Sequence, residues 1–169
     1  MEEVVAKLLK DNCLTVACAE SCTGGMLASR LTSISGSSMY IKGSIVTYSN
    51  EAKMKFLDVD KEILDTKGAV SPEVAKQMAE GVRKAVGSDI GVGITGIAGP
   101  TGGTDKKPVG LVYIAVAGKD NTVVKENIFS GDRARVRYRS TQQALEMIRQ
   151  YIKLSLIHIS EPTRQAEIS

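Results

Sequence analysis

The stretch LTVACAESCTGGMLASRL, residues 14–31, changes from one structural pattern to another at a pair of glycines. Its first part, Leu14 to Ala19, is a short apolar run that is typical of a buried strand. Small polar residues and the glycines follow, and Gly24 to Leu31 then places apolar residues at helical spacing. The stretch therefore predicts a strand that passes through a tight turn directly into a helix.

The same two patterns continue along the rest of the chain. Helical spacing of apolar residues predicts a first helix over 2–10 and a last one over about Arg133–Ile152. Capping residues predict two more: one begins at Glu51 with Asn50 as its cap, and the other begins after Ser71 and ends at Gly87. Apolar runs predict strands over Ser44–Tyr48, Ile90–Thr95, Val109–Ala117 and Thr122–Phe129, the last two as an antiparallel hairpin. Because the early strands alternate with helices, we expect a three-layer α/β/α fold with a mixed, partly parallel central sheet, in a single domain over residues 1–153.

The composition excludes several classes of protein. Of the 169 residues, 43% are hydrophobic and 24% are charged, and the formal net charge is only +3. No window is apolar enough for a membrane helix, and the first residues lack the pattern of a signal peptide, so we expect a cytoplasmic protein with no membrane contact. Aromatic residues are scarce and the basic residues form no long tract, so nucleic acid is not an expected partner. A small anionic ligand suits this modest positive charge.

The reactive side chains narrow the chemistry further. The cysteines Cys13, Cys18 and Cys22 form no CxxC pair, and the chain has a single histidine, His158. We therefore expect no metal site and no cofactor, and a Ser–His or Cys–His catalytic pair is excluded from the body of the domain.

The last residues, LSLIHISEPTRQAEIS at 154–169, do not fit the pattern of the domain. The Glu161-Pro162 step is expected to break any helix that continues into them. The run resembles the translated adapter or vector read-through that is found at the ends of assembled reading frames. On this interpretation the tail is not native sequence and His158 has no functional role.

Ser21, in the turn after the first predicted strand, is the first candidate for chemistry. The backbone N–H groups of Thr23, Gly24 and Gly25, at the start of a predicted helix, could stabilise an anion or a developing oxyanion. The structural alternative is that Ser21 or Thr23 caps this helix and that the glycines only form the bend. The stretch alone leaves both interpretations open.

A second candidate is VTYSNEAK, residues 46–53, which ends a predicted strand and places Lys53 in the first turn of a helix. A serine nucleophile without a histidine needs another base, and a lysine with a lowered pKa can serve. Tyr48 could relay a proton or hold the substrate. The alternative is a capped surface helix on which Lys53 is solvated.

A third candidate is the glycine-rich run GVGITGIAGPTGGTDKKPVG, residues 91–110. Its first glycines match GxGxxG, but two of them lie inside a predicted strand, Pro100 prevents a long helix, and no acidic residue follows near Val116. A Rossmann site is therefore rejected, and the run also lacks a P-loop motif. What remains is a loop that could wrap a phosphate or ribose, or an unliganded loop.

The fourth candidate is FSGDRARVRYR, residues 129–139, which opens the last predicted helix. A guanidinium at Arg133 could bind a phosphate through two hydrogen bonds. Arg137 follows one turn later and could share its face, whereas Arg135 and Arg139 fit a solvated surface.

Six segments in this order and spacing closely resemble the CinA C-terminal domain family: AESCTGG, TYSNEAK, GAVS, GIAGPTGG, KPVG and FSGDR. The family is also known as nicotinamide-nucleotide amidohydrolase, or nicotinamide mononucleotide deamidase, and the likeness covers residues 3–153. The resemblance implies hydrolysis of nicotinamide mononucleotide to nicotinate mononucleotide and ammonia, a step in pyridine nucleotide salvage.

The resemblance also implies roles for particular residues. Ser21 would be the nucleophile, Lys53 its base and Tyr48 an assisting group, while Cys22 is a rival nucleophile because a thiolate is intrinsically more reactive. Thr23, Gly24 and Gly25 would cradle the oxyanion or substrate. The implied substrate-binding residues are completed by Asn50, Gly96, Gly99, Gly102, Gly103 and Arg133.

Two other functions stay open at this point. The chain could be a non-catalytic nucleotide-binding module that serves a partner domain, or a DNA-associated competence protein, although the latter has no extended basic surface. Many family members carry a further N-terminal domain, so the sequence fits either a stand-alone form or a fragment. The habit of the family implies a homo-oligomer.

Overall fold

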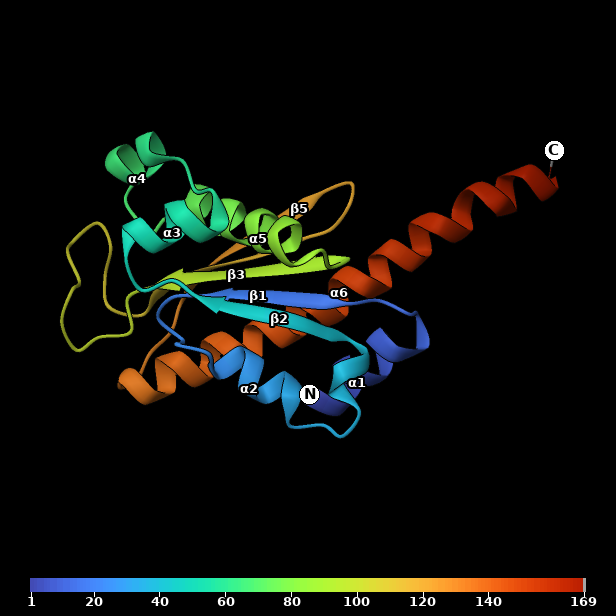
Figure 1. Cartoon of the computed structure of the whole chain (residues 1–169), viewed down its shortest axis with the longest axis horizontal. Helices are drawn as coiled ribbons and strands as arrows, with labels where there is room; N and C mark the ends of the chain where they lie inside the picture. Colours follow the sequence, from blue (N-terminus) through green and yellow to red (C-terminus); the bar gives the residue numbers. More distant parts are fainter. Residues whose placement is uncertain (169) are drawn as a thin grey trace.

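A five-stranded sheet lies between two layers of helices in the computed structural model, which describes residues 1–168 and the side chains up to residue 157 (Figure 1). The strands are β1 (Val16–Glu20), β2 (Ile41–Val46), β3 (Ile90–Gly96), β4 (Leu111–Ala117) and β5 (Thr122–Ile128). Their order across the sheet is β2-β1-β3-β4-β5. β1 runs parallel to β2 and β3, whereas β4 is antiparallel to β3 and β5. The predicted α/β fold with a mixed sheet and a terminal hairpin is confirmed.

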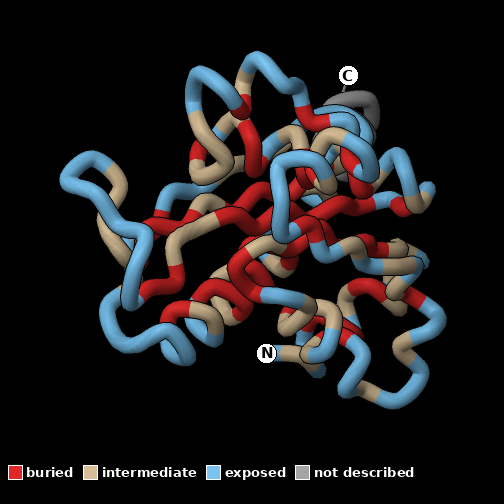
Figure 2. Tube along the Cα trace, turned by 60° about the vertical axis from the view of Figure 1, so that its left-hand side comes forward, coloured by how far each residue is buried: buried red, intermediate tan, exposed pale blue. Residues whose placement is uncertain are grey.

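The two faces of the sheet are covered by different helices. One face carries α1 (Glu2–Asp11), α2 (Met26–Thr32) and α6 (Arg133–Ile168), and the other carries α3 (Asn50–Leu57), α4 (Lys61–Lys67) and α5 (Pro72–Val86). A short 3-10 helix, η1 (Ser37–Met39), precedes β2. Because side chains alternate along a strand, β1 contributes to both layers of core. Figure 2 shows the resulting buried chain running through the middle of the molecule.

The parallel strands bring three distant chain segments to one edge of the sheet. Glu20, the last residue of β1, is paired with Val46 at the end of β2 and with Ile94 in β3. The turn after β1, the residues after β2 and the loop after β3 therefore leave the sheet side by side. In open α/β sheets this carboxyl edge is the usual place for a ligand.

Glycines in β3 let α5 pack directly on the strand backbone. A Cβ atom added at Gly91 would lie 2.1 Å from the main-chain oxygen of Ala79, and one at Gly93 would lie 2.5 Å from that of Ala75. No side chain fits in these positions unless α5 moves. The first glycines of the GxGxxG match thus serve helix–sheet packing, in agreement with the rejection of a Rossmann site.

Helix α6 is longer than expected, because it continues past Ile152 and through Pro162 to Ile168. The expected break at Glu161-Pro162 is therefore wrong. A proline removes only one helical hydrogen bond, and here the helix continues away from the sheet (Figure 1). His158 lies outside the residues whose side chains are described. No helix in the described part of the chain has the length and apolar character needed to cross a bilayer.

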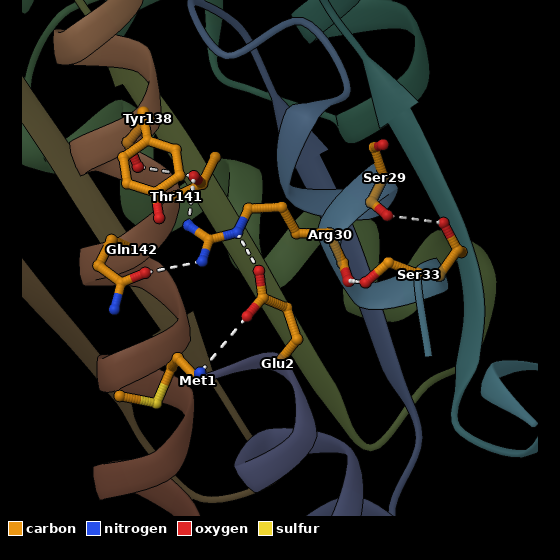
Figure 3. A network of polar contacts seen from close by, with 9 residues as sticks. Met1, Glu2, Ser29, Arg30, Ser33, Tyr138, Thr141 and Gln142 are labelled. Carbon is orange, nitrogen blue, oxygen red and sulfur yellow. Dashed lines mark hydrogen bonds and ion pairs between the residues drawn. The ribbon is translucent and has the colours of Figure 1, made fainter. Parts of the chain in front are cut away.

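Arg30 of α2 joins the three helices on one face (Figure 3). Its Nε donates to Glu2 Oε1 at 2.7 Å, Nη1 donates to Thr141 Oγ1 at 3.0 Å, and Nη2 donates to Gln142 Oε1 at 2.7 Å. The guanidinium also lies 4.7 Å from the ring centroid of Tyr138. Because these partners belong to α1 and α6, one side chain fixes α2 against both helices.

We predict that Gly91→Ala lowers the free energy of unfolding by about 1–3 kcal/mol, because the added methyl group forces α5 away from β3. Gly43→Ala in β2 is the matched control, since its Cβ would meet only the Val86 side chain, at 3.3 Å. Urea denaturation of the two variants measures the difference. Equal losses for both would contradict close packing of α5 on β3.

The ion pair between Glu2 and Arg30 predicts an acid-sensitive component of stability. Hydrogen bonding to Arg30 is the largest cause that lowers the pKa of Glu2 from 4.5 to about 2. The pair therefore stabilises the fold above about pH 4.5, and its contribution disappears as the pH falls through about 2. In thermal melts, wild type is expected to be more stable than Glu2→Gln above about pH 4.5, and this difference is expected to shrink as the pH falls toward about 2. Glu3→Gln, at an exposed neighbouring position, is expected to show no such trend.

Candidate active site

The carboxyl edge of the sheet contains a cavity of about 240 Å³. Ser21 and Cys22 enter it from the turn after β1, Tyr48 from the end of β2, and Arg133 from the start of α6. The loop after β3 forms the remaining wall with a segment that includes Gly96, Gly99 and Gly102. Residues that are far apart in the sequence thus line one small space.

Lys53 of α3 reaches Ser21 across the ends of β1 and β2. Its Nζ donates to Ser21 Oγ at 3.2 Å and to the main-chain oxygen of Thr47 at 2.8 Å. The side chain is only 2% exposed, and no carboxylate among the described side chains lies within ion-pairing distance of it. Burial lowers the pKa of Lys53, and the neighbouring Cys22 thiol opposes this shift. The surface-helix alternative, with a solvated Lys53, is therefore wrong.

Helix α3 places this lysine through a serine cap. Ser49 has extended backbone angles, with φ −129° and ψ 161°, and its side chain accepts a hydrogen bond from the backbone N–H of Ala52 at 3.1 Å. The helix begins at Asn50, so the expectation that Asn50 is the cap is wrong. Asn50 is exposed and lies outside the lining of the cavity, and its role in substrate binding stays a prediction.

Glu20 organises the turn that carries Ser21, and no sequence pattern had pointed to it. Its carboxylate is fully buried and accepts hydrogen bonds from the backbone N–H groups of Leu27 at 2.9 Å and Ala28 at 3.1 Å. These are N-terminal donors of α2, so Glu20 satisfies the positive end of this helix. Neither Ser21 nor Thr23 caps α2, so that part of the structural alternative is wrong, whereas Gly24 and Gly25 do form the bend, with φ of +57° and +99°.

The turn itself offers unpaired hydrogen-bond donors. The N–H of Gly24 donates to the Ser21 carbonyl at 3.0 Å, and the N–H of Met26 donates to that of Thr23 at 3.0 Å. In the part of the chain that the structure describes, the N–H groups of Cys22, Thr23 and Gly25 have no carbonyl acceptor. Of these residues only Cys22 lines the cavity, whereas Thr23 is fully buried and Gly24 and Gly25 lie outside the lining. The Cys22 N–H is therefore the candidate donor for a ligand or an oxyanion there, and the expected role of Thr23, Gly24 and Gly25 as a cradle stays a prediction.

Cys22 is a poor rival to Ser21. Its side chain is 5% exposed, and burial is the largest cause that raises the pKa of its thiol to about 11. Since the thiolate is the nucleophilic form, little of it exists at neutral pH. The geometry therefore favours Ser21, which contacts the lysine.

Arg133 joins two walls of the cavity. Its Nη1 donates to the main-chain oxygen of Gly99 at 2.9 Å, and its Nη2 donates to the Tyr48 hydroxyl at 2.9 Å. Further N–H groups of the guanidinium remain for a ligand. The loop is held at its other end by Lys107, whose Nζ donates to the main-chain oxygen of Lys67 at 2.5 Å.

The glycines expected to bind the nucleotide fall into two groups. Gly96, Gly99 and Gly102 line the cavity, whereas Gly103 does not. A Cβ at Gly103 would lie 2.7 Å from the backbone nitrogen of Val109, so this glycine serves the packing of the loop on itself. Within the described side chains, no three His, Cys, Asp or Glu residues gather closely enough to hold a metal ion.

The fold and the site define an α/β domain in which a half-buried serine contacts a buried lysine at the carboxyl edge of a mixed sheet. Comparison with known proteins adds that residues 1–152 match the CinA C-terminal domain. The chain belongs to the CinA C-terminal domain family, and the resemblance seen in its sequence is confirmed.

Solved structures and curated proteins agree with this assignment. The crystal structure of the competence/damage inducible protein CihA from Agrobacterium tumefaciens matches with a TM-score of 0.84 and 41% identity, over 87% of this chain and 92% of that one. A CinA superfamily protein from Klebsiella pneumoniae matches with a TM-score of 0.87 and 32% identity, over 90% and 95% of the two chains. A Moorella thermoacetica protein that is named as competence-damage inducible is 55% identical over 148 residues, which are 88% of this chain and 36% of the relative. The chain thus spans just over a third of the length of such relatives.

We predict that buried Lys53 makes the stability of the fold depend on pH in the alkaline range. Because its folded-state pKa lies below the usual 10.5, the unfolded chain binds more protons between these two values, and stability rises with pH there. In Lys53→Met this component is absent, so wild type is expected to gain stability relative to the variant as the pH rises toward 10.5. Thermal melts at several pH values measure the gap.

Lys55→Met is the matched control, because Lys55 is exposed on the same helix. A gap between wild type and Lys53→Met that stays constant with pH would contradict a lowered pKa.

Proposed function

We propose that this domain is an amidohydrolase that converts nicotinamide mononucleotide to nicotinate mononucleotide and ammonia. The observation that carries the proposal is the buried Lys53 amine, which lies 3.2 Å from Ser21 Oγ and pairs with no carboxylate among the described side chains. A buried lysine that lacks a counter-ion favours its neutral form, and a neutral amine can accept the proton of a serine. The chain has no histidine in the domain body that could take this role.

The first half of the reaction forms an acyl-enzyme. With one N–H donated to the Thr47 oxygen at 2.8 Å, the neutral Lys53 amine can direct its lone pair at the Ser21 hydroxyl. As the proton moves to Lys53 Nζ, Ser21 Oγ bonds to the carboxamide carbon, and the carbonyl oxygen becomes an oxyanion. The unpaired N–H group of Cys22, which lines the cavity, stabilises this charge. The C–N bond then breaks, and ammonia leaves with the proton returned by Lys53.

The second half releases the product. Water attacks the acyl carbon while Lys53 accepts its proton. The oxyanion of the second tetrahedral intermediate accepts a hydrogen bond from the same turn N–H. The bond to Ser21 Oγ then breaks, and Lys53 returns the proton to the serine. The enzyme regains a neutral amine and a free hydroxyl, so no other residue has to store a proton between the two halves.

Arg133 and the cavity size support a nucleotide as the substrate. A cavity of about 240 Å³ is small beside most ligand pockets, so it encloses the carboxamide end of a nucleotide and leaves the rest at its mouth. The remaining N–H groups of Arg133 suit a phosphate there, and its bond to Tyr48 holds the phenol against the same wall. The proposal concerns this domain, since the curated relatives are much longer.

We expect the purified chain to release ammonia and nicotinate mononucleotide from nicotinamide mononucleotide. Ser21→Ala and Lys53→Met are each expected to lower kcat by roughly 10³-fold or more, whereas Lys55→Met retains activity. Because Lys53 must be neutral to act, kcat/KM is expected to rise with pH through its lowered pKa. Product analysis and pH profiles of the variants measure these effects.

Two outcomes would change the assignment. Activity that survives Ser21→Ala and disappears in Cys22→Ala would move the nucleophile to the neighbouring residue. A folded wild type that binds the nucleotide and releases no ammonia would favour the alternative function, a non-catalytic nucleotide-binding module.

A further inference from the structure

Arg137 clamps the turn that carries Ser21, and the proposed reaction assigns it no role. Its Nε donates to the carbonyl oxygen of Cys22 at 3.1 Å, and its Nη2 donates to that of Thr23 at 3.1 Å. Among the described side chains, no carboxylate pairs with it. One half-buried guanidinium therefore directs its charge at two successive carbonyl groups of the turn.

The bond to the Cys22 carbonyl also sets the direction of a hydrogen-bond donor. The Cys22 carbonyl and the Thr23 N–H belong to one planar trans peptide, in which the C=O and N–H bonds point in opposite directions. Since the carbonyl faces Arg137, the Thr23 N–H faces away from it. Thr23 is fully buried and lies outside the lining of the cavity, so this N–H is not open to a ligand. The Thr23 carbonyl belongs to the next peptide, whose Gly24 N–H donates to the Ser21 carbonyl at 3.0 Å. Arg137 therefore fixes the path of the backbone that leaves Ser21.

Gly24 gives Arg137 the space for this contact. A Cβ at Gly24 would lie 3.2 Å from Arg137 Nη2, and the residue has a φ of +57°. Gly24 was expected to help cradle the oxyanion or substrate. In the structure, its lack of a side chain leaves room for the Arg137 guanidinium beside the turn.

We propose that Arg137 is a positioning residue that holds the turn after Ser21 in the conformation from which Ser21 Oγ contacts Lys53 and acyl transfer proceeds. The inference rests on the proposed amidohydrolase function. Arg133 and Arg137 then have different roles at the start of α6. Arg133 holds the loop and Tyr48 at the cavity wall, and Arg137 holds the turn. Arg137 does not touch the substrate in this scheme, so its loss affects the rate of chemistry and not the binding of the nucleotide.

The test compares the full chain with Arg137→Ala, Arg137→Lys and the matched control Arg135→Ala, which removes an exposed arginine from the same helix turns. With nicotinamide mononucleotide, Arg137→Ala is expected to lower kcat by about 10–100-fold, with KM changed less than about threefold. Guanidinium ion at non-denaturing concentration is expected to restore part of the rate, and sodium chloride at the same ionic strength is not. Arg137→Lys keeps the charge but cannot bridge both carbonyls, so an intermediate rate is expected.

A second substrate separates this inference from the proposed function. p-Nitrophenyl acetate needs no nucleotide recognition: Ser21 Oγ bonds to the acetyl carbon, the ester bond breaks, nitrophenolate leaves, and the serine proton passes to Lys53. The burst of nitrophenolate is expected to slow in Arg137→Ala and to recover with guanidinium. If wild type shows this burst and does not hydrolyse the nucleotide, the proposed function fails while the role of Arg137 is still judged by the burst rates.

Three results would overturn the role of Arg137. They are a kcat and burst rate for Arg137→Ala equal to those of Arg135→Ala, a rate loss that guanidinium does not rescue in a folded variant, and the absence of both reactions in wild type. If Arg137→Ala does not fold, Arg137→Lys decides, because wild-type rates in that variant would show that bridging of the carbonyls is unnecessary.

Discussion

The buried carboxylate of Glu20 is the constraint on which the site depends. A fully buried charge is costly unless it is hydrogen-bonded, and the backbone N–H groups of Leu27 and Ala28 supply the bonds. Its main-chain oxygen also accepts a bond from the N–H of Thr47 at 2.8 Å, next to the carbonyl that holds Lys53. One residue therefore fixes the end of β1, the start of α2 and the exit from β2, and Ser21 follows it directly.

The basic side chains near this turn lie in different environments, and the environment of each decides its role. Burial lowers the pKa of Lys53, and no carboxylate among the described side chains pairs with it, which suits a base. Arg133 and Arg137 lie one helical turn apart on α6 and donate to backbone oxygens, so each guanidinium holds a neighbouring segment. The first turns of α6 thus connect the loop after β3 with the turn after β1.

Local features of the fold were predictable from the sequence, whereas long-range contacts were not. Ser71 caps α5 and Gly87 ends it in a left-handed conformation, as expected, because capping depends on a few adjacent residues. Ser49 replaced Asn50 as the cap of α3, since both residue types can cap and only the backbone angles decide. The lack of a histidine suggested Lys53 as a possible base for Ser21, but only the family resemblance implied that the two act together. The buried position of Glu20 could not be recognised from the sequence, because an acidic residue at the end of an apolar run also fits an exposed strand end.

The loop after β3 is tethered near both ends, by Arg133 at Gly99 and by Lys107 at the oxygen of Lys67. Between these tethers, residues 100–106 are all exposed. A ligand that orders this span has to offset the conformational entropy of a few residues only, since the flanking backbone is already fixed in the free protein. The tethers thus reduce the entropic cost of binding, and they confine any adjustment to ligand shape to the outermost part of the loop.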